Sequence, residues 1–198
     1  MAAKLAFIFF SMILTNNYVL VKFLGICPFL GVSKKLDSAV GMSAAVTFVM
    51  VVATLATWPV YTYLLEPNGL AYLQTIVFIL VIAILVQLLE TVMKKFMPPL
   101  YKALGIYLPL ITTNCTILGV TILNLDSGYS YLESIVCALG AGLGFMLAMV
   151  LFSGVRKRLE DAQPPKCFEG LPITLVAASI VSLSFTGFGG LIENIFGM

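Results

Sequence analysis

The sequence contains no histidine, and this absence excludes a whole group of catalytic chemistries. Without imidazole, this chain offers no Ser-His-Asp triad, no histidine general base and no histidine metal ligand. Charged residues are also scarce, at 10% of 198 residues, whereas soluble domains carry about 25%. The net charge of +2 is too small to indicate nucleic-acid binding, and four cysteines do not make a disulfide scaffold. These deficits exclude an ordinary soluble domain.

Long apolar runs are what the sequence has in abundance. Hydrophobic residues make up 61% of the chain, and the mean hydropathy is +1.08. A helix needs about 20 apolar residues to cross a bilayer, and six stretches of 22 to 28 residues are free of charge or nearly so: 5–32, 38–65, 67–89, 103–125, 134–155 and 170–192. Runs of this length favour helices over barrel strands. We therefore predict an all-α integral membrane protein with six transmembrane helices and a single domain, 1–198.

The charges between these spans predict an orientation. Nine of the eleven basic residues lie in the connections after the first, third and fifth spans: Lys34, Lys35, Lys94, Lys95, Lys102, Arg156, Lys157, Arg158 and Lys166. The connections after the second and fourth spans carry only acids: Glu66, Asp126 and Glu133. By the positive-inside rule the basic side is cytoplasmic and both termini face outward, with Lys4 as an exception. No signal-peptide cleavage site follows Lys4, so we expect the first span to be retained.

Two similar motifs divide the chain into halves. "CPFLGV" at 27–32 and "CTILGV" at 115–120 are offset by 88 residues, and this offset carries the first predicted helix onto the fourth. Three helices are an odd number, so a second, related half must insert upside-down. We expect two inverted three-helix repeats, about 1–95 and 96–198. The first and fourth helices should be interrupted by the prolines and glycines near the cysteines: Gly25, Pro28, Gly31, Pro109 and Gly119.

Cys27 and Cys115 are the candidate site residues. Free cysteine is most often a small buried apolar side chain, and a disulfide is a second reading of the pair. Paired interrupted helices in inverted halves, however, typically mark a site near the membrane midplane. Two thiolates there would be half of the four ligands that a [2Fe–2S] cluster usually takes, with a second polypeptide supplying the rest. Cys137 and Cys167 have no repeat partner, and we expect them to be structural.

Polar groups near the two cysteines and two charged residues complete the candidate list. Backbone amides and side chains at four positions are expected to hydrogen-bond the sulfurs: Gly25, Ile26, Asn114 and Thr116. Glu90 is the only acid that could lie at membrane depth, which makes it a candidate for a cation path. The alternative is an interfacial carboxylate paired with Lys94, one turn further on. Lys22 either balances charge near Cys27 or extends to the interface, and we favour the second reading.

Three segments carry a resemblance to a known family. "VLVKFLGICPFLGVSKKL" (19–36), "VQLLETVMKKF" (86–96) and "PPLYKALGIYLPLITTNCTILGV" (98–120) resemble the A-type subunits of Rnf complexes. These complexes are membrane-bound ferredoxin:NAD oxidoreductases coupled to Na⁺ or H⁺ transport. The resemblance covers essentially the whole chain. The E subunit of the Na⁺-translocating NADH:quinone reductase is the alternative, although "CPFLGVSKK" and "ITTNC" fit the Rnf version better.

The resemblance implies a shared redox site. Cys27 and Cys115 would hold one [2Fe–2S] cluster together with two cysteines of a homologous E subunit of opposite topology. It also implies B, C, D and G subunits as partners, flavins in D and G only, and a prokaryotic inner membrane as location. "GAGLG" at 140–144 does not fit a nucleotide motif and is expected to be a helix-packing site. An inverted-repeat secondary transporter or a structural assembly protein fits the same topology without a redox centre.

Overall fold

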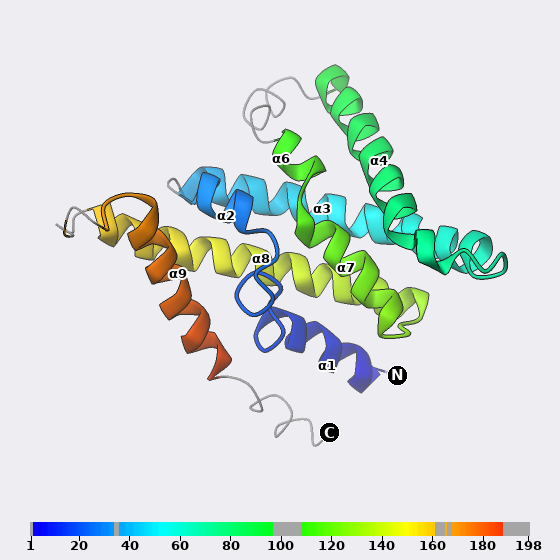
Figure 1. The fold of residues 1–198 in the computed structure, drawn as a ribbon, viewed down its shortest axis with the longest axis horizontal. Helices are drawn as coiled ribbons and strands as arrows, with labels where there is room; N and C mark the ends of the chain where they lie inside the picture. Colours follow the sequence, from blue (N-terminus) through cyan, green and yellow to red (C-terminus); the bar gives the residue numbers. More distant parts are fainter. Residues whose placement is uncertain (1, 34–35, 97–107, 161–164, 166–167, 188–198) are drawn as a thin grey trace.

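Two long helices form the centre of the molecule. The structure, a computed structural model, describes residues 2–33, 36–96, 108–160, 165 and 168–187. Helix α3 (Leu36–Val60), extended by one π-helical stretch (Tyr61–Leu65), lies beside α8 (Tyr131–Glu160) (Figure 1). Their contact is built from large, fully buried side chains one turn apart: Met42, Val46 and Met50 on α3, and Phe145, Met149 and Phe152 on α8.

The two central helices run in opposite directions. Near the end of α3, the Trp58 indole N–H donates to the Tyr129 carbonyl at 3.1 Å, just before α8 begins. The Trp58 ring also meets Tyr131 edge-on, with ring centroids 5.2 Å apart. At the opposite end, Arg156 of α8 contacts Ser33, three residues before α3. The end of α3 therefore lies beside the start of α8, and the start of α3 lies beside the end of α8.

Helix α1 (Ala2–Ile13) packs against α8 through glycines. A Cβ added to Gly140 would lie 2.9 Å from the carbonyl oxygen of Phe9, and one added to Gly144 would lie 2.8 Å from that of Met12. No side chain fits at either position, so glycine lets the two backbones approach more closely than any other residue would. The prediction that 140–144 is a packing segment is confirmed.

Two helices lie at the edge of the bundle. Helix α4 (Gln74–Phe96) follows a short 3-10 turn (Ala71–Leu73), and α9 (Leu171–Thr186) lies against the other side of the centre (Figure 1). Both expose large apolar side chains, as expected of surfaces that meet lipid or another protein. Those exposed are Ile76, Ile79, Leu80, Ile84 and Leu88 on α4, and Leu171, Leu175, Ile180 and Leu183 on α9.

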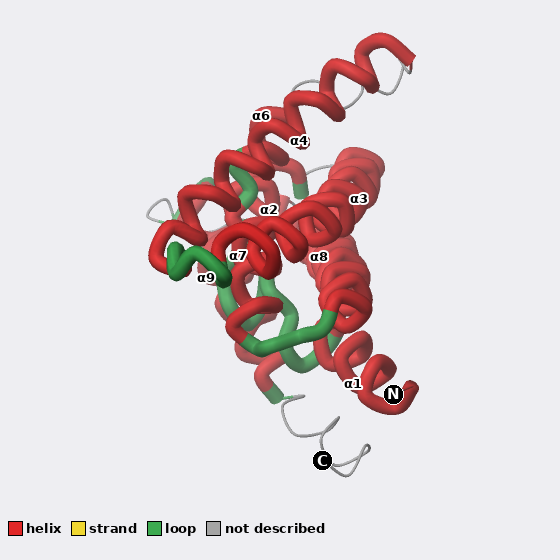
Figure 2. The backbone as a smooth tube through the Cα atoms, turned by 90° about the vertical axis from the view of Figure 1, so that its right-hand side faces the viewer, coloured by secondary structure: helices red, strands yellow, loops and turns green. Residues whose placement is uncertain are grey.

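The predicted helical class is confirmed, and the lengths of the helices agree with the predicted membrane location. Among the described residues no strand occurs (Figure 2), and three helices are long and apolar enough to cross a membrane: Leu36–Leu65, Ala71–Val92 and Tyr131–Leu159. Three further apolar helices are shorter: Lys4–Ile13, Leu110–Asp126 and Leu171–Thr186. The shorter ones fall in the predicted first, fourth and sixth spans.

Several predicted boundaries are wrong. The third span is predicted at 67–89, but α4 begins at Gln74 and continues through Lys94 and Lys95 to Phe96. Lysines suit the last turn of a helix because they interact favourably with its free carbonyls, so the charge does not end the helix. For the same reason α8 runs past the predicted end at 155 into its basic turn. The predicted sixth span extends to 192, of which residues 188–192 lie outside the described residues.

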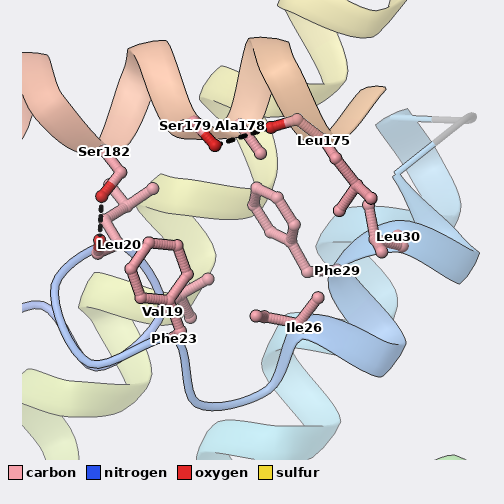
Figure 3. Close-up of a pocket in the computed structure, with 10 residues that line it drawn as sticks. All are labelled: Val19, Leu20, Phe23, Ile26, Phe29, Leu30, Leu175, Ala178, Ser179 and Ser182. Carbon is pink, nitrogen blue, oxygen red and sulfur yellow. Dashed lines mark hydrogen bonds between the residues drawn. The ribbon is translucent and has the colours of Figure 1, made fainter. Parts of the chain in front are cut away.

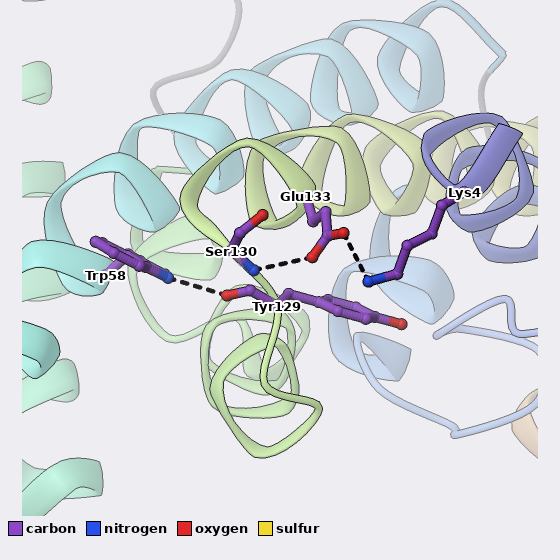
Figure 4. A network of polar contacts seen from close by, with 5 residues as sticks. All are labelled: Lys4, Trp58, Tyr129, Ser130 and Glu133. Atoms are coloured by element: carbon purple, nitrogen blue, oxygen red, sulfur yellow. Dashed lines mark hydrogen bonds and ion pairs between the residues drawn. The ribbon is translucent and has the colours of Figure 1, made fainter. Parts of the chain in front are cut away.

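The one basic residue predicted on the acidic side is ion-paired. Lys4 Nζ lies 2.7 Å from Glu133 Oε1, and the Ser130 amide donates to Glu133 Oε2 at 3.0 Å (Figure 4). The start of α1 therefore lies at the same end of the molecule as the start of α8. One lysine does not outweigh the nine basic residues in the connections after the first, third and fifth spans, so the predicted orientation is unchanged.

Candidate functional site

The first predicted span is broken into two helices. After α1, residues 14–25 form a series of turns, and the chain becomes helical again only in α2 (Ile26–Val32). Gly25 is the residue before α2 and has a φ of +81°, in the left-handed region that favours glycine. The chain thus enters α2 through a backbone conformation that other residues adopt with difficulty.

Asn17 holds this break together. Its side chain is fully buried, and its Nδ2 donates to the carbonyls of Ile13 at 3.2 Å and of Gly144 at 2.8 Å. Its Oδ1 accepts from the amides of Val19 at 3.0 Å and Leu20 at 3.4 Å. One side chain therefore closes the end of α1, starts the following turn and ties both to the middle of α8.

The fourth predicted span is broken in a simpler way. Helix α6 (Leu108–Thr112) and helix α7 (Cys115–Asp126) are separated by two residues only. Asn114 is the N-cap of α7, and its Oδ1 accepts a hydrogen bond from the Thr116 amide at 3.1 Å. Asparagine is among the best N-cap residues, so the break begins a new helix at Cys115.

The residues predicted to cause the breaks are mostly not the ones that do. Pro28 and Gly31 lie inside α2, and Pro109 is the second residue of α6. Proline is tolerated in the first turn of a helix because its missing N–H would have no partner there. Only Gly25 marks a boundary; polar residues at 15–17 and 113–114 occupy the breaks themselves.

The two breaks meet, although they are 90 residues apart in sequence. The Gly25 amide donates a hydrogen bond to the Cys115 sulfur, with an N–S distance of 3.0 Å. A Cβ added to Gly25 would lie 2.1 Å from Thr116 Oγ1 and 3.1 Å from the Phe145 ring. Glycine is therefore required at position 25 for two reasons. Its φ is positive, and there is no room for a Cβ atom.

The two cysteines occupy equivalent places and differ from Cys137. Cys27 is the second residue of α2, Cys115 is the first residue of α7, and both are exposed free thiols. Cys137 is fully buried in the core. The reading as a small buried apolar side chain thus describes Cys137 and is wrong for the other two. Cys167 lies outside the described residues.

The contact between the two breaks lies halfway along α8. Phe145, which faces Gly25, is the fifteenth of the 30 residues of α8. With a rise of about 1.5 Å per residue, about 20 Å of helix extends on each side of Phe145. Cys27 and Cys115 begin the two helices that start here, so their backbones lie near this depth.

Two buried donors beside Cys115 have no hydrogen-bond partner among the described residues. They are Asn114 Nδ2 and Thr116 Oγ1, on side chains that are 4% and 0% exposed. A buried polar group without a partner costs about 1–3 kcal/mol. A pocket of about 350 Å³ lies between α4 and the second break, and Asn114 and Cys115 are among the residues that line it. The site therefore has exposed thiols, free donors and space beside it.

The other predicted residues lie apart from this point. Glu90 is half-buried on α4, seven residues beyond Ala83 of the pocket wall, which is about 10 Å along the helix. Lys22 is exposed, and its ammonium lies 5.1 Å from the centre of the Tyr18 ring. The structure does not bring either charge into the wall of the pocket beside Cys115.

A second, smaller pocket lies between α2 and α9. It holds about 50 Å³, and Ile26 and Phe23 line it (Figure 3). At its edge the Ser182 hydroxyl donates to the Leu20 carbonyl, so α9 is tied to the first break. Its lining contains no ionisable side chain. The Ile26 amide is predicted to donate to a sulfur, but the amide-to-sulfur bond found among the described residues comes from Gly25.

Sequence reasoning missed the role of Asn17 and the contact between the breaks. An asparagine within an apolar span is costly unless its amide is satisfied, and this was the available signal. One partner that satisfies the Asn17 amide is the carbonyl of Gly144, which is 127 residues away in the sequence. A local pattern cannot predict that pairing.

The fold, the apolar surface and the paired breaks define a helical membrane protein, and comparison with known proteins gives its family. Residues 5–192 match the model of the Rnf-Nqr subunit membrane protein family, and the chain belongs to this family. It is 55% identical to the A-type subunit of the Na⁺-translocating ferredoxin:NAD⁺ oxidoreductase complex of Acetobacterium woodii, over 94% of this chain and 97% of that one. The A-type subunits of the ion-translocating oxidoreductase complexes of Syntrophotalea carbinolica and Escherichia coli are 53% and 51% identical, over 96% and 94% of this chain and 99% and 96% of theirs.

Proposed function

We propose that this chain is the A-type membrane subunit of an ion-translocating ferredoxin:NAD⁺ oxidoreductase complex. The family match and relatives of the same length with this name support the proposal. In this proposal the oxidoreductase activity belongs to the complex, and this chain contributes to it as one subunit. The proposed partners are an E subunit of opposite topology and the B, C, D and G subunits, with flavins in D and G.

Cys27 and Cys115 are proposed to supply two of the four thiolates of a [2Fe–2S] cluster, the other two coming from the E subunit. The observation that carries this is the contact between the breaks, where the Gly25 amide reaches the Cys115 sulfur. The exposed thiols and the two unpartnered donors beside them fit such a group. When bound, the cluster would accept and return one electron at a time. An electron carrier in the middle of the membrane would divide the crossing of about 30 Å into two shorter steps.

The surrounding residues have defined tasks in this proposal. Cys115 is the first residue of a twelve-residue helix, and the N-terminal dipole of this helix would interact favourably with a negatively charged group bound there. The Gly25 amide stabilises the same sulfur by a hydrogen bond. Asn114 fixes the start of α7 with its Oδ1 and keeps its Nδ2 free as a donor. Hydrogen bonds to sulfur raise the potential of an iron–sulfur centre, so these groups set its value.

The proposed arrangement in the membrane is two inverted repeats, about 1–95 and 96–198. In this arrangement α3 corresponds to α8, and their opposite directions support it. The broken segments α1–α2 and α6–α7 correspond in the same way. The basic end faces the cytoplasm of a prokaryotic cell, both termini lie outside, and the membrane is the inner one.

The test is the iron content of the purified complex. Cys27→Ser and Cys115→Ser should each abolish the EPR signal of the cluster and the matching iron and acid-labile sulfide. Cys137→Ser, which changes a buried thiol that lies on α8 and not at the start of α2 or α7, is the matched control and should keep all three. Normal iron and sulfide in both site variants would reject the cluster and favour an inverted-repeat transporter or an assembly protein. Reduction by NADH but not by reduced ferredoxin would favour the E subunit of the quinone reductase.

Glu90 is proposed to lie on the path of the coupling cation. Its support is its half-buried position on α4, because an acid at membrane depth is most often functional. Glu90→Gln should lower Na⁺ or H⁺ transport several-fold while the EPR signal persists. Transport at the wild-type rate would remove Glu90 from the path and leave the interfacial carboxylate as its role.

A further inference from the structure

Arg156 holds the far end of the short helix that carries Cys27. This arginine lies on α8, and its Nη1 donates to the Leu30 carbonyl and, at 2.9 Å, to Ser33 Oγ. Ser33 is fully buried and is the C-cap of α2. The last carbonyls of a helix have no partner within it, and a cation near them is favourable. Arg156 supplies both the donor and the charge.

Helix α2 depends on such outside support. It has seven residues, whereas isolated helices shorter than about 12–15 residues are marginally stable. Phe29 of α2 stacks on Phe152 of α8, with ring centroids 4.2 Å apart. Phe152 and Arg156 are one turn apart and therefore lie on the same face of α8. This face holds α2 at two points, one apolar and one charged.

The other end of α2 is the candidate site. Gly25 accepts a hydrogen bond from the Phe29 amide at 3.2 Å and donates to the Cys115 sulfur. A movement of α2 would displace Cys27 and alter this bond at the same time. We infer that Arg156 is a positioning residue for both thiols, because it fixes α2 on α8 and thereby the placement of Cys27 relative to Cys115.

The neighbouring basic residues provide the control. Lys157 and Arg158 are exposed, whereas Arg156 is half-buried against α2. Arg158→Gln removes the same charge from the same end of the molecule without touching α2. A comparison with Arg156→Gln therefore separates positioning from the effect of basic residues on membrane orientation.

The inference rests on the proposed function, so the experiment measures α2 and the cluster separately in the purified complex. Hydrogen–deuterium exchange of peptides covering 26–33 reports on α2 directly. Loss of a charged hydrogen bond should raise this exchange about tenfold or more in Arg156→Gln, with α3 unchanged. Loss of the EPR signal to a chelator should become on the order of tenfold faster. Arg158→Gln should match the wild type in both measurements.

The inference would be overturned if peptides 26–33 of Arg156→Gln exchanged hydrogen at the wild-type rate. It would also be overturned if this exchange rose while the EPR signal was lost to the chelator at the wild-type rate. Normal iron in Cys27→Ser would reject the proposed cluster instead, and the exchange result would still stand for α2.

If Arg156→Gln fails to insert, two milder variants replace it. Ser33→Ala removes one acceptor, and Arg156→Lys keeps the charge without the planar group. Both should give intermediate exchange and cluster loss; wild-type values in both would overturn the inference.

Discussion

The two helix breaks bring a cysteine to the same kind of place by different means. The first break is twelve residues long, 14–25, and ends in a glycine with a positive φ and no side-chain cap. The second is two residues long and ends in an asparagine whose side chain caps the next helix. The first depends on distant partners on α8 and α7, the second on a local bond. The two breaks should therefore differ in which substitutions they tolerate.

The largest expected effect is at Gly25, where the first break depends on the absence of a side chain. In Gly25→Ala the new Cβ would overlap the buried Thr116 Oγ1, and the positive φ alone costs about 1–3 kcal/mol. We expect the affinity of the site for its iron to fall about tenfold, by analogy with other residues that support metal ligands, and the cluster's share of the iron to fall with it. The control is Gly31→Ala on the same short helix, where a Cβ meets nothing within 4 Å. Equal iron in the two variants would contradict the comparison.

A smaller effect is expected at Asn17, which holds the first break through four hydrogen bonds. Asn17→Ala removes the acceptor of two amides and the donor to the carbonyls of Ile13 and Gly144, at a cost of about 2–4 kcal/mol. Thermal unfolding of the purified protein in detergent should show this as a lower midpoint. Asn16→Ala is the control, because Asn16 is exposed and its side chain donates to the nearby Ser11 hydroxyl. A midpoint as high as that of Asn16→Ala would mean that the break does not depend on α8.

The smallest effect is expected at Asn114, where the cap and the free donor can be separated. Asn114→Asp keeps an oxygen to cap α7 but loses Nδ2, whereas Asn114→Leu loses both. A lost hydrogen bond of about 1 kcal/mol corresponds to about 40 mV for a one-electron couple. We expect redox titration by EPR to give a lower midpoint potential in both variants. Loss of the cap, at about 1 kcal/mol, should lower thermal stability in Asn114→Leu only. An unchanged potential in Asn114→Leu would remove this side chain from the site.

Much of the fold could be predicted because it depends on composition. Apolar runs of more than twenty residues predicted the helical membrane class, and the two cysteine motifs predicted which helices are broken. The cause of the breaks could not be predicted in the same way. Pro28 and Pro109 suggested breaks at the prolines, but a proline in the first turn of a helix disturbs nothing.

The details of the site depend on contacts between distant residues. Gly25 looked like a local helix breaker, but its role is set by Cys115 and Thr116, about 90 residues further on. Asn17 depends in the same way on Gly144. Such pairings follow from how α1, α7 and α8 pack together, and a pattern read along one segment does not contain that information.

The contact between α1 and α8 also bears on leakage through the membrane. At Gly140 and Gly144 the carbonyl oxygens of α1 come so near to α8 that not even a methyl group fits between the helices. A file of water molecules needs more room than a methyl group, so neither water nor a hydrated ion can pass along this seam at mid-depth. Backbone contact thus makes this seam an electrical insulator. In a protein whose proposed complex builds an ion gradient, the seam would prevent the gradient from discharging between α1 and α8, next to the first break.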